Sequence, residues 1–273
     1  VYKLASLTNV LESDAATVRQ GTNTNEILLP KIDMDGLADY DRNGGYVDGD
    51  DKLTWETVKF DYDRGRAFSV DAMDDEETIG ISFGMLSSQF IRNKVVPEMD
   101  AYRFAKYAGT SGITVKSEAL ATGDQACSAI TAANNVLDES EVNAEGRILF
   151  LTPTLHNAII ALDTYKSKAM LEGFSSVVKV PQTRFYTAID LLDGKTTGEE
   201  IGGYKKSQTG KNINFMIIDK SAVIQFTKHI VNKIITPEAN QTADAWKFFY
   251  RAYGLTDVYE NKVKGVYCSH STT

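Results

Sequence analysis

The sequence predicts a protein of the α+β class on three observations. Apolar and polar residues alternate over residues 53–62 and 67–73, which is the two-residue period of a half-buried strand. Between residues 79 and 108, apolar side chains recur at spacings of mostly three and four, the period of a helix. The strands and helices that follow are interleaved in no regular strand–helix–strand rhythm, which indicates a mixed fold.

Composition limits the classes of protein to consider. The chain has 273 residues, of which 42% are hydrophobic and 10% aromatic, enough to bury a core in one large or two modest domains. A net charge of −8 argues against a general nucleic-acid binder, because such binding depends on clustered Lys and Arg. No apolar run approaches the ~20 residues that a bilayer crossing needs, so no membrane contact is expected. Two cysteines, Cys127 and Cys268, make no disulfide framework and favour a reducing cytosol as the site of synthesis.

Residues 1–52 are predicted to form an extended N-terminal arm. Residues 8–25 are rich in Ser, Thr, Asn, Gln and Ala, and the short apolar segment 27–32 is predicted to be the arm's one strand. An acidic, turn-rich stretch then continues to Asp51. A free arm of this composition is disordered unless something else holds it.

Residues 53–78 are predicted to form a long β-hairpin with its turn at residues 63–66. Each arm of about ten residues would reach roughly 30 Å at ~3.3 Å per residue. An isolated two-stranded ribbon is marginally stable, so the hairpin needs a neighbour to lie on. The apolar side chains predicted to make that contact are Val58, Phe60, Tyr62, Phe68 and Val70.

Residues 79–108 are predicted to form a long helix that follows an acidic N-terminal cluster. Pro97 interrupts the pattern, so the helix is kinked there or a second helix begins with Pro97 at its first position. A further helix is expected from Asp124, a buried strand over residues 147–151, and a helix capped by Thr152 with Pro153 at its first position. Residues 243–253 are unusually aromatic and are predicted to form a closing strand.

The stretch DYDRNGGYVDGD, residues 39–50, matches the opening of a calcium-binding loop. Its twelfth position is Asp50 rather than a bidentate Glu, and its eighth is Tyr46 rather than an aliphatic residue. The flanks are predicted to be extended, whereas an EF-hand needs two helices. Dense Asp, Asn and Gly are also common turn residues, so the turn is favoured over a calcium-dependent binding module.

No catalytic constellation, cofactor motif or metal site is predicted. His156, His229 and His270 lie on three separate predicted elements, with no ligand-spaced pair among them. Cys127 lies among small residues on a predicted helix and is expected to be packed rather than reactive. The glycine pairs form neither a dinucleotide-binding motif nor a P-loop, and the neighbouring acidic residues are expected to be solvated. An enzyme is therefore not expected.

Four stretches carry a resemblance to a known family. LTWETVKFDYDRGRAFSVDAMDDEET (53–78), FIRNKVVPEMDAYRFAKYA (90–108), RILFLTPTLHNAI (147–159) and ADAWKFFYRAYGLTDVYENKVKGVY (243–267) resemble parts of the major capsid protein of tailed bacteriophages, which has the Hong-Kong-97-like fold. The first is similar to the extended-loop hairpin, the second to the spine helix, the third to the start of the axial domain and the last to the closing strands of the peripheral domain. The Val-Pro-Glu-x-Asp-Ala-Tyr run at residues 96–102 is the most specific of these motifs.

The resemblance implies a division into parts. These are an N-terminal arm at 1–52, the extended-loop hairpin at 53–78, the spine helix and peripheral domain at 79–145, the axial domain at 146–222, and a return to the peripheral domain at 223–273. In this interpretation residues 39–50 are the hinge between arm and hairpin. Some relatives remove an N-terminal segment during maturation, so processing is an expected cause of a chain that begins at Val1.

The resemblance also implies a function. The chain is expected to assemble with copies of itself into hexamers and pentamers of an icosahedral head shell, which encloses double-stranded DNA without binding it specifically. Portal, scaffolding or decoration proteins are expected partners, the virion is the expected location, and the bacterial host cytoplasm is the expected site of assembly. An encapsulin-like compartment shell, which shares this fold, is the alternative.

Overall fold

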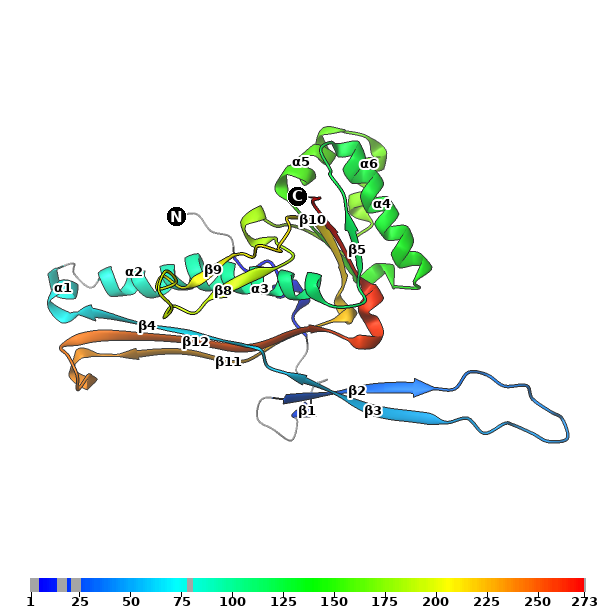
Figure 1. Ribbon diagram of the computed structural model, residues 1–273, viewed down its shortest axis with the longest axis horizontal. Coiled ribbons are helices and arrows are strands. Elements are labelled where there is room, and N and C mark those ends of the chain that lie inside the picture. Colours follow the sequence, from blue (N-terminus) through cyan, green and yellow to red (C-terminus); the bar gives the residue numbers. More distant parts are fainter. Residues whose placement is uncertain (1–4, 14–18, 21–25, 78–80, 273) are drawn as a thin grey trace.

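The computed structural model describes residues 5–13, 19–20, 26–77 and 81–272. An upright block of helices and strands stands on a long layer of sheet and helix, and a thin hairpin projects beyond the block (Figure 1). The strands are β1 (Arg19–Gln20), β2 (Glu26–Met34), β3 (Asp51–Lys59), β4 (Tyr62–Asp71), β5 (Thr114–Ser117), β6 (Arg147–Leu151), β7 (Ser176–Lys179), β8 (Ile189–Leu192), β9 (Gly203–Lys206), β10 (Ile213–Asp219), β11 (Val223–Ile235), β12 (Ala245–Val258) and β13 (Val266–His270). The α-helices are α1 (Ala72–Glu77), α2 (Ile81–Phe90), α3 (Val96–Gly109), α4 (Gly123–Glu139), α5 (Pro153–Ala161) and α6 (Tyr165–Glu172).

The upright block is built on a five-stranded sheet of order β5-β13-β10-β6-β7. Its central strands β6 and β10 are apolar on both faces because both faces are covered. Leu149, Leu151 and Ile217 pack in the cluster that helices α4 and α5 share. Ile148 and Met216 pack in the opposite cluster, with Phe104 and Tyr107 of α3. The predicted buried strand at residues 147–151 is confirmed as β6.

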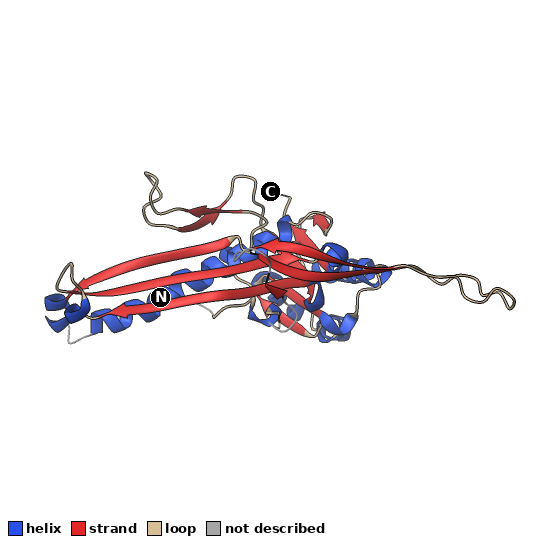
Figure 2. Cartoon of the chain, turned by 90° about the horizontal axis from the view of Figure 1, so that it is seen from below, coloured by secondary structure: helices blue, strands red, loops and turns tan. Residues whose placement is uncertain are grey.

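The long layer consists of the sheet β11-β12-β4 with a helical spine along one face (Figure 1). The spine runs from Ile81 to Gly109 as α2, a π-helical turn at Ile91–Val95, and α3. Pro97 lies in the first turn of α3, where a missing N–H costs little. Val95 of the spine and Phe248 of β12 belong to one buried cluster. No helix of the described residues covers the other face of the sheet (Figure 2).

The predicted hairpin at residues 53–78 is wrong. Strands β3 and β4 do not pair with each other: β3 pairs antiparallel with β2, and β4 pairs antiparallel with β12. The predicted turn at 63–66 lies inside β4, where Gly65 faces Arg251. A Cβ on Gly65 would lie 2.8 Å from the carbonyl oxygen of Tyr250, so this glycine permits close approach of two strands. The real hairpin is β2–β3 with residues 35–50 at its tip.

Three of the predicted segments therefore contain elements that belong to a different part of the structure. The apolar segment in the predicted arm 1–52 is strand β2 of the projecting hairpin. Within the predicted segment 79–145, β5 and α4 belong to the upright block, because β5 pairs with β13 and α4 packs on the five-stranded sheet. Within 223–273, β13 is also part of that block, while β11 and β12 lie in the long layer. Residues distant in sequence form each layer.

Candidate assembly surface

The base of the β2–β3 hairpin is fixed to the body by apolar side chains. Ile27 lies opposite Val58 in the register of the two strands. Both are buried in a cluster with Leu29, Phe60 and others, against Ile224 and Leu255 of β11 and β12. The outer ion pair Lys31–Glu260, at 3.2 Å, links the hairpin to the segment after β12. The base is thus part of the chain's own core.

Carboxylates gather near this base. Burial is the main cause that raises the pKa of Glu56, and the negative charges of Glu260 and Asp257 add to it. Burial also raises the pKa of Asp257, with Lys106 opposing and Asp61 adding to the shift. The folded hairpin base is therefore more stable when Glu56 and Asp257 are protonated than when they are ionised.

The outer part of the hairpin, residues 34–53, exposes apolar side chains to solvent. Leu37 is fully exposed and Tyr46 is 88% exposed. Tyr40 and Tyr46 lie with ring centroids 4.9 Å apart, so the tip presents a small aromatic cluster. The other exposed apolar side chains of this part are Met34, Val47 and Leu53. A projecting loop that carries such residues is typical of an interaction site rather than of a free surface.

Residues 39–50 form the tip of this hairpin and not a hinge. Asp41 and Gly45 exchange backbone hydrogen bonds of 3.2 and 2.7 Å, and Gly45 has φ +80°. The carboxylate of Asp41 accepts from the backbone N–H of Asn43 at 3.1 Å, as in an Asx-turn. Strands β2 and β3 flank the loop, so it is not an EF-hand. Over the described ranges, no three His, Cys, Asp or Glu side chains are grouped to hold a metal ion.

The five residues predicted to contact a neighbour lie elsewhere than expected. Val58, Phe60 and Tyr62 are buried within their own chain, which leaves little of their surface for a neighbour to contact. Phe68 is half-buried against the rings of Phe90 and Phe248, and Val70 is half-buried opposite Trp246 in β12. A contact of any of the five with a neighbour stays a prediction, and Phe68 and Val70 have the more accessible side chains. The exposed residues of the tip were missed, although their apolar character within an acidic, glycine-rich stretch was a usable signal.

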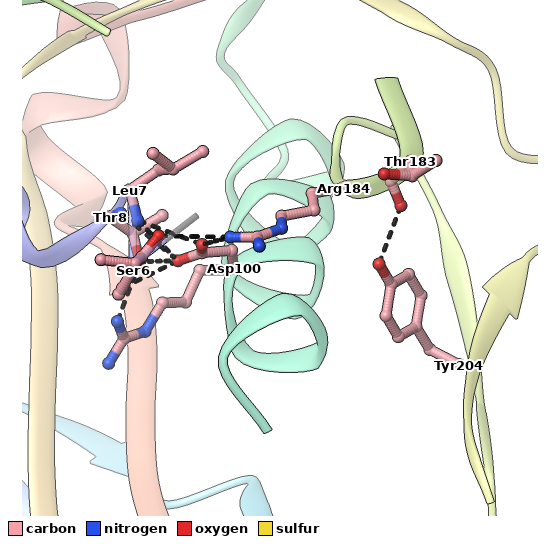
Figure 3. Close-up of polar contacts among 9 residues, drawn as sticks. Ser6, Leu7, Thr8, Asp100, Thr183, Arg184 and Tyr204 are labelled. Atoms are coloured by element: carbon pink, nitrogen blue, oxygen red, sulfur yellow. Dashed lines mark hydrogen bonds and ion pairs between the residues drawn. The ribbon is translucent and has the colours of Figure 1, made fainter. Parts of the chain in front are cut away.

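A polar junction holds the spine, the N-terminal segment and the upright block together (Figure 3). Asp100 of α3 is fully buried and forms an ion pair with Arg184 at 2.9 Å. Its carboxylate also accepts from the hydroxyls of Ser6 and Thr8, at 2.9 and 2.8 Å, and from the backbone N–H of Leu7 at 3.1 Å. These donors compensate the cost of burying the charge of Asp100. The junction therefore fixes the geometry of three separate parts.

A second set of contacts attaches the β8–β9 hairpin to β4. The Nε of Arg64 donates to Glu98 of the spine at 2.8 Å, and its Nη2 donates to the carbonyl oxygens of Leu192 and Gly203. Burial, together with the charge of Glu98, raises the pKa of the Tyr62 hydroxyl well above its ordinary value. One arginine thus joins the long sheet, the spine and the small hairpin.

The described residues offer no assembled nucleophile. His156, His229 and His270 lie on α5, β11 and β13. Burial lowers the pKa of His156, with Lys179 adding to the shift. Burial raises the pKa of the Cys268 thiol to about 12, which leaves it protonated and unreactive, and it also raises the pKa of Cys127. Over the described part of the chain, no helix is long and apolar enough to cross a membrane.

Comparison with solved structures shows that this architecture is similar to those of phage capsids and a virus-like particle. A structure from Gordonia phage Cozz matches with a TM-score of 0.66 and 11% identity, over 100% of this chain and 88% of that one. The capsid of Cyanophage P-SCSP1u matches with a TM-score of 0.62 and 11% identity, over 100% and 90%. A virus-like particle from Pyrococcus furiosus matches with a TM-score of 0.56 and 10% identity, over 90% and 86%. No protein-family model and no curated protein matches the chain significantly in sequence.

Proposed function

We propose that this chain, which has the Hong-Kong-97-like fold of the capsid structures it matches, is the major capsid protein of a tailed bacteriophage. The predicted fold is confirmed, because the similarity to these structures covers the whole chain. In the proposed role, copies of the chain assemble into hexamers and pentamers of an icosahedral head shell. The shell encloses double-stranded DNA, and the chain catalyses no reaction.

The observation that carries the proposal is the projecting β2–β3 hairpin. Its base is fixed in the chain's own core, while its outer part exposes Leu37, Tyr40 and Tyr46 at the end of a long reach. Beyond Leu29, which is packed in the core, the five remaining residues of β2 at ~3.3 Å each extend roughly 15 Å before the tip begins. Apolar side chains displayed at that distance are stabilised only when another molecule covers them.

The acidic composition fits a container for DNA. A chain of net charge −8 has no general affinity for phosphate backbones, so packaged DNA is held by enclosure rather than by binding. Portal, scaffolding and decoration proteins are proposed partners on the strength of the fold alone. The virion is the proposed location, with assembly in the host cytoplasm.

Electron microscopy of the purified protein tests the proposal. Closed shells, or their hexamers and pentamers, are expected. A matched variant in which residues 35–50 are replaced by a short Asn-Gly turn is expected to yield folded subunits that do not close shells. A wild-type chain that stays monomeric at high concentration contradicts the proposal.

The encapsulin-like compartment has the same fold, and the contents of the shell distinguish it from a phage head. Shells that contain protein cargo and no DNA, when purified from the native source, favour the compartment. Shells filled with double-stranded DNA favour the phage head. The calcium-dependent module is no longer a candidate, because residues 39–50 are a hairpin tip between two strands.

A further inference from the structure

One asparagine at the tip of the β2–β3 hairpin is followed by glycine. Asn43 and Gly44 lie in the loop between Asp41 and Gly45, and both are exposed. Among the asparagines of the chain, Asn43 is the only one whose next residue is Gly. The backbone nitrogen that follows an asparagine can close a five-membered ring with the side-chain carbonyl carbon, and a glycine has no Cβ to crowd that approach. The pair therefore meets the covalent requirements for ring closure.

The fold leaves both reacting groups of this pair without hydrogen bonds. Within the described residues, neither the backbone N–H of Gly44 nor the side-chain amide of Asn43 has a hydrogen-bond partner. The bonds of the loop are made by other atoms: Asp41 and Gly45 exchange backbone bonds, and the backbone N–H of Asn43 donates to the carboxylate of Asp41. A backbone nitrogen bonded in a helix or a sheet is held away from the preceding side chain, whereas the nitrogen of Gly44 is held by neither.

Exposure alone does not distinguish Asn43 from the other asparagines. Asn143 is exposed as well, but its Oδ1 accepts from the backbone N–H of Glu145 at 3.1 Å, and the residue after it is Ala144. This side chain would have to break a hydrogen bond before it reacted, and the Cβ of the alanine would crowd the attacking nitrogen. The structure thus separates Asn43 from an equally exposed asparagine by both its neighbour and its hydrogen bonding.

We propose that Asn43 is a site of spontaneous deamidation in the folded chain. The backbone nitrogen of Gly44 attacks Cγ of Asn43, the new N–Cγ bond closes a succinimide ring, and the Cγ–Nδ2 bond breaks. The N–H proton of Gly44 leaves with the amide nitrogen as ammonia. Water then adds to one of the two ring carbonyl carbons, and the ring C–N bond at that carbon breaks to leave aspartate or isoaspartate. Water is the co-reactant, and no oxidant or reductant takes part.

The reaction changes both the charge and the backbone of the tip. The new carboxyl group is ionised at neutral pH, because an aspartate side chain has an ordinary pKa of about 3.9. Residues 35–50 hold five Asp and one Arg, so a converted tip gains one more negative charge. Isoaspartate also inserts one carbon into the main chain between Asp41 and Gly45, whose paired hydrogen bonds close the loop. Aged protein therefore contains tips that differ in charge and in backbone geometry.

Peptide mass spectrometry of the folded chain tests the proposal. The protein is kept dilute, so that subunits do not assemble, and is aged at mildly alkaline pH. A lysine-specific protease then releases residues 32–52 as one peptide, which contains Asn43 and no other Asn. A mass gain equal to the exchange of an amide for an acid therefore reports Asn43 alone, and it is expected to grow with time. The peptide that contains Asn143 is the control in the same digest and is expected to keep its amides.

Two comparisons give the expected magnitudes. Gly44→Ala is expected to slow the conversion about tenfold, because the added Cβ crowds the attacking nitrogen. That Cβ would lie 3.1 Å from Oδ2 of Asp41, an exposed side chain that can move, so the circular dichroism of the variant is expected to match the wild type. The free peptide 32–52 is expected to convert within about threefold of the rate in the folded chain, since the fold holds neither reacting group.

Three results would overturn the proposal. One is a folded chain that converts about ten times more slowly than the free peptide, which would show that the fold protects the pair. Another is conversion of the Asn143 peptide as fast as that of the Asn43 peptide. The third is a Gly44→Ala chain that converts at the wild-type rate. None of these measurements depends on shell assembly, so the capsid function stands or falls separately.

Discussion

Replacing Asp100 by asparagine is expected to destabilise the folded chain by about 3–5 kcal/mol, the usual cost of removing one partner of a buried ion pair. Asparagine preserves the shape of the side chain and removes its charge. Arg184, which is only 2% exposed, then remains a buried cation that has lost the charge of Asp100. The donors of the N-terminal segment also lose a charged acceptor, and each such hydrogen bond contributes about 1.5–3 kcal/mol when made.

A second substitution separates the two parts of this loss. The double variant Asp100→Asn with Arg184→Met no longer contains the buried cation, so about half of the lost stability is expected to return. The rest stays lost because the backbone N–H of Leu7 and the hydroxyls of Ser6 and Thr8 still lack the carboxylate. The N-terminal segment is expected to become sensitive to proteases in both variants.

Guanidinium-chloride unfolding, extrapolated linearly to water, measures the free energies. The control is Asp163→Asn, which breaks an ion pair with Lys168 on the surface and is expected to leave stability unchanged. A loss below about 1 kcal/mol for Asp100→Asn would refute the assignment of the junction as a buried, charge-paired site. Equal losses in the variant and its control would refute it as well.

Three further outcomes are expected. Phe60→Ala should lower the free energy of unfolding of the single subunit by about 3–5 kcal/mol, because Phe60 is buried in the core. Tyr46→Ala should leave that free energy unchanged and weaken shell assembly. If Phe60→Ala instead weakened assembly and left the subunit's stability unchanged, Phe60 would be an interface residue. Gly123→Ala should cost about 1–3 kcal/mol in the same measurement, because its Cβ would lie 2.3 Å from a backbone oxygen of α5, whereas Gly109→Ala meets open space and should cost nothing. Because the pKa of Glu56 is raised in the folded chain, its contribution to stability is present below pH 4.5 and is lost as the pH rises through the raised value. The free energy of unfolding of Glu56→Gln should therefore fall less than that of the wild type between about pH 4 and pH 7.

Local chemistry in the sequence predicted most of the elements. Four consecutive apolar residues, Ile148 to Leu151, define strand β6, and Thr152 and Pro153 define the start of α5, because burial on both faces and helix initiation depend on nearby residues. The spine was predicted from the spacing of its apolar side chains for the same reason. The aromatic closing strand β12 likewise follows from its own composition.

The sequence by itself therefore determined the helix or strand character of these segments, but the tertiary structure alone decided which strands are partners. An alternating pattern specifies one buried face of β3 and of β4 and contains no information about the edge on which each finds its neighbour. Gly65 shows the consequence: it has the composition of a turn, yet it lies in mid-strand because β12 approaches closely there. The same long-range pairing buried Val58, Phe60 and Tyr62 inside the chain and left the tip residues Leu37, Tyr40 and Tyr46 as the exposed apolar surface.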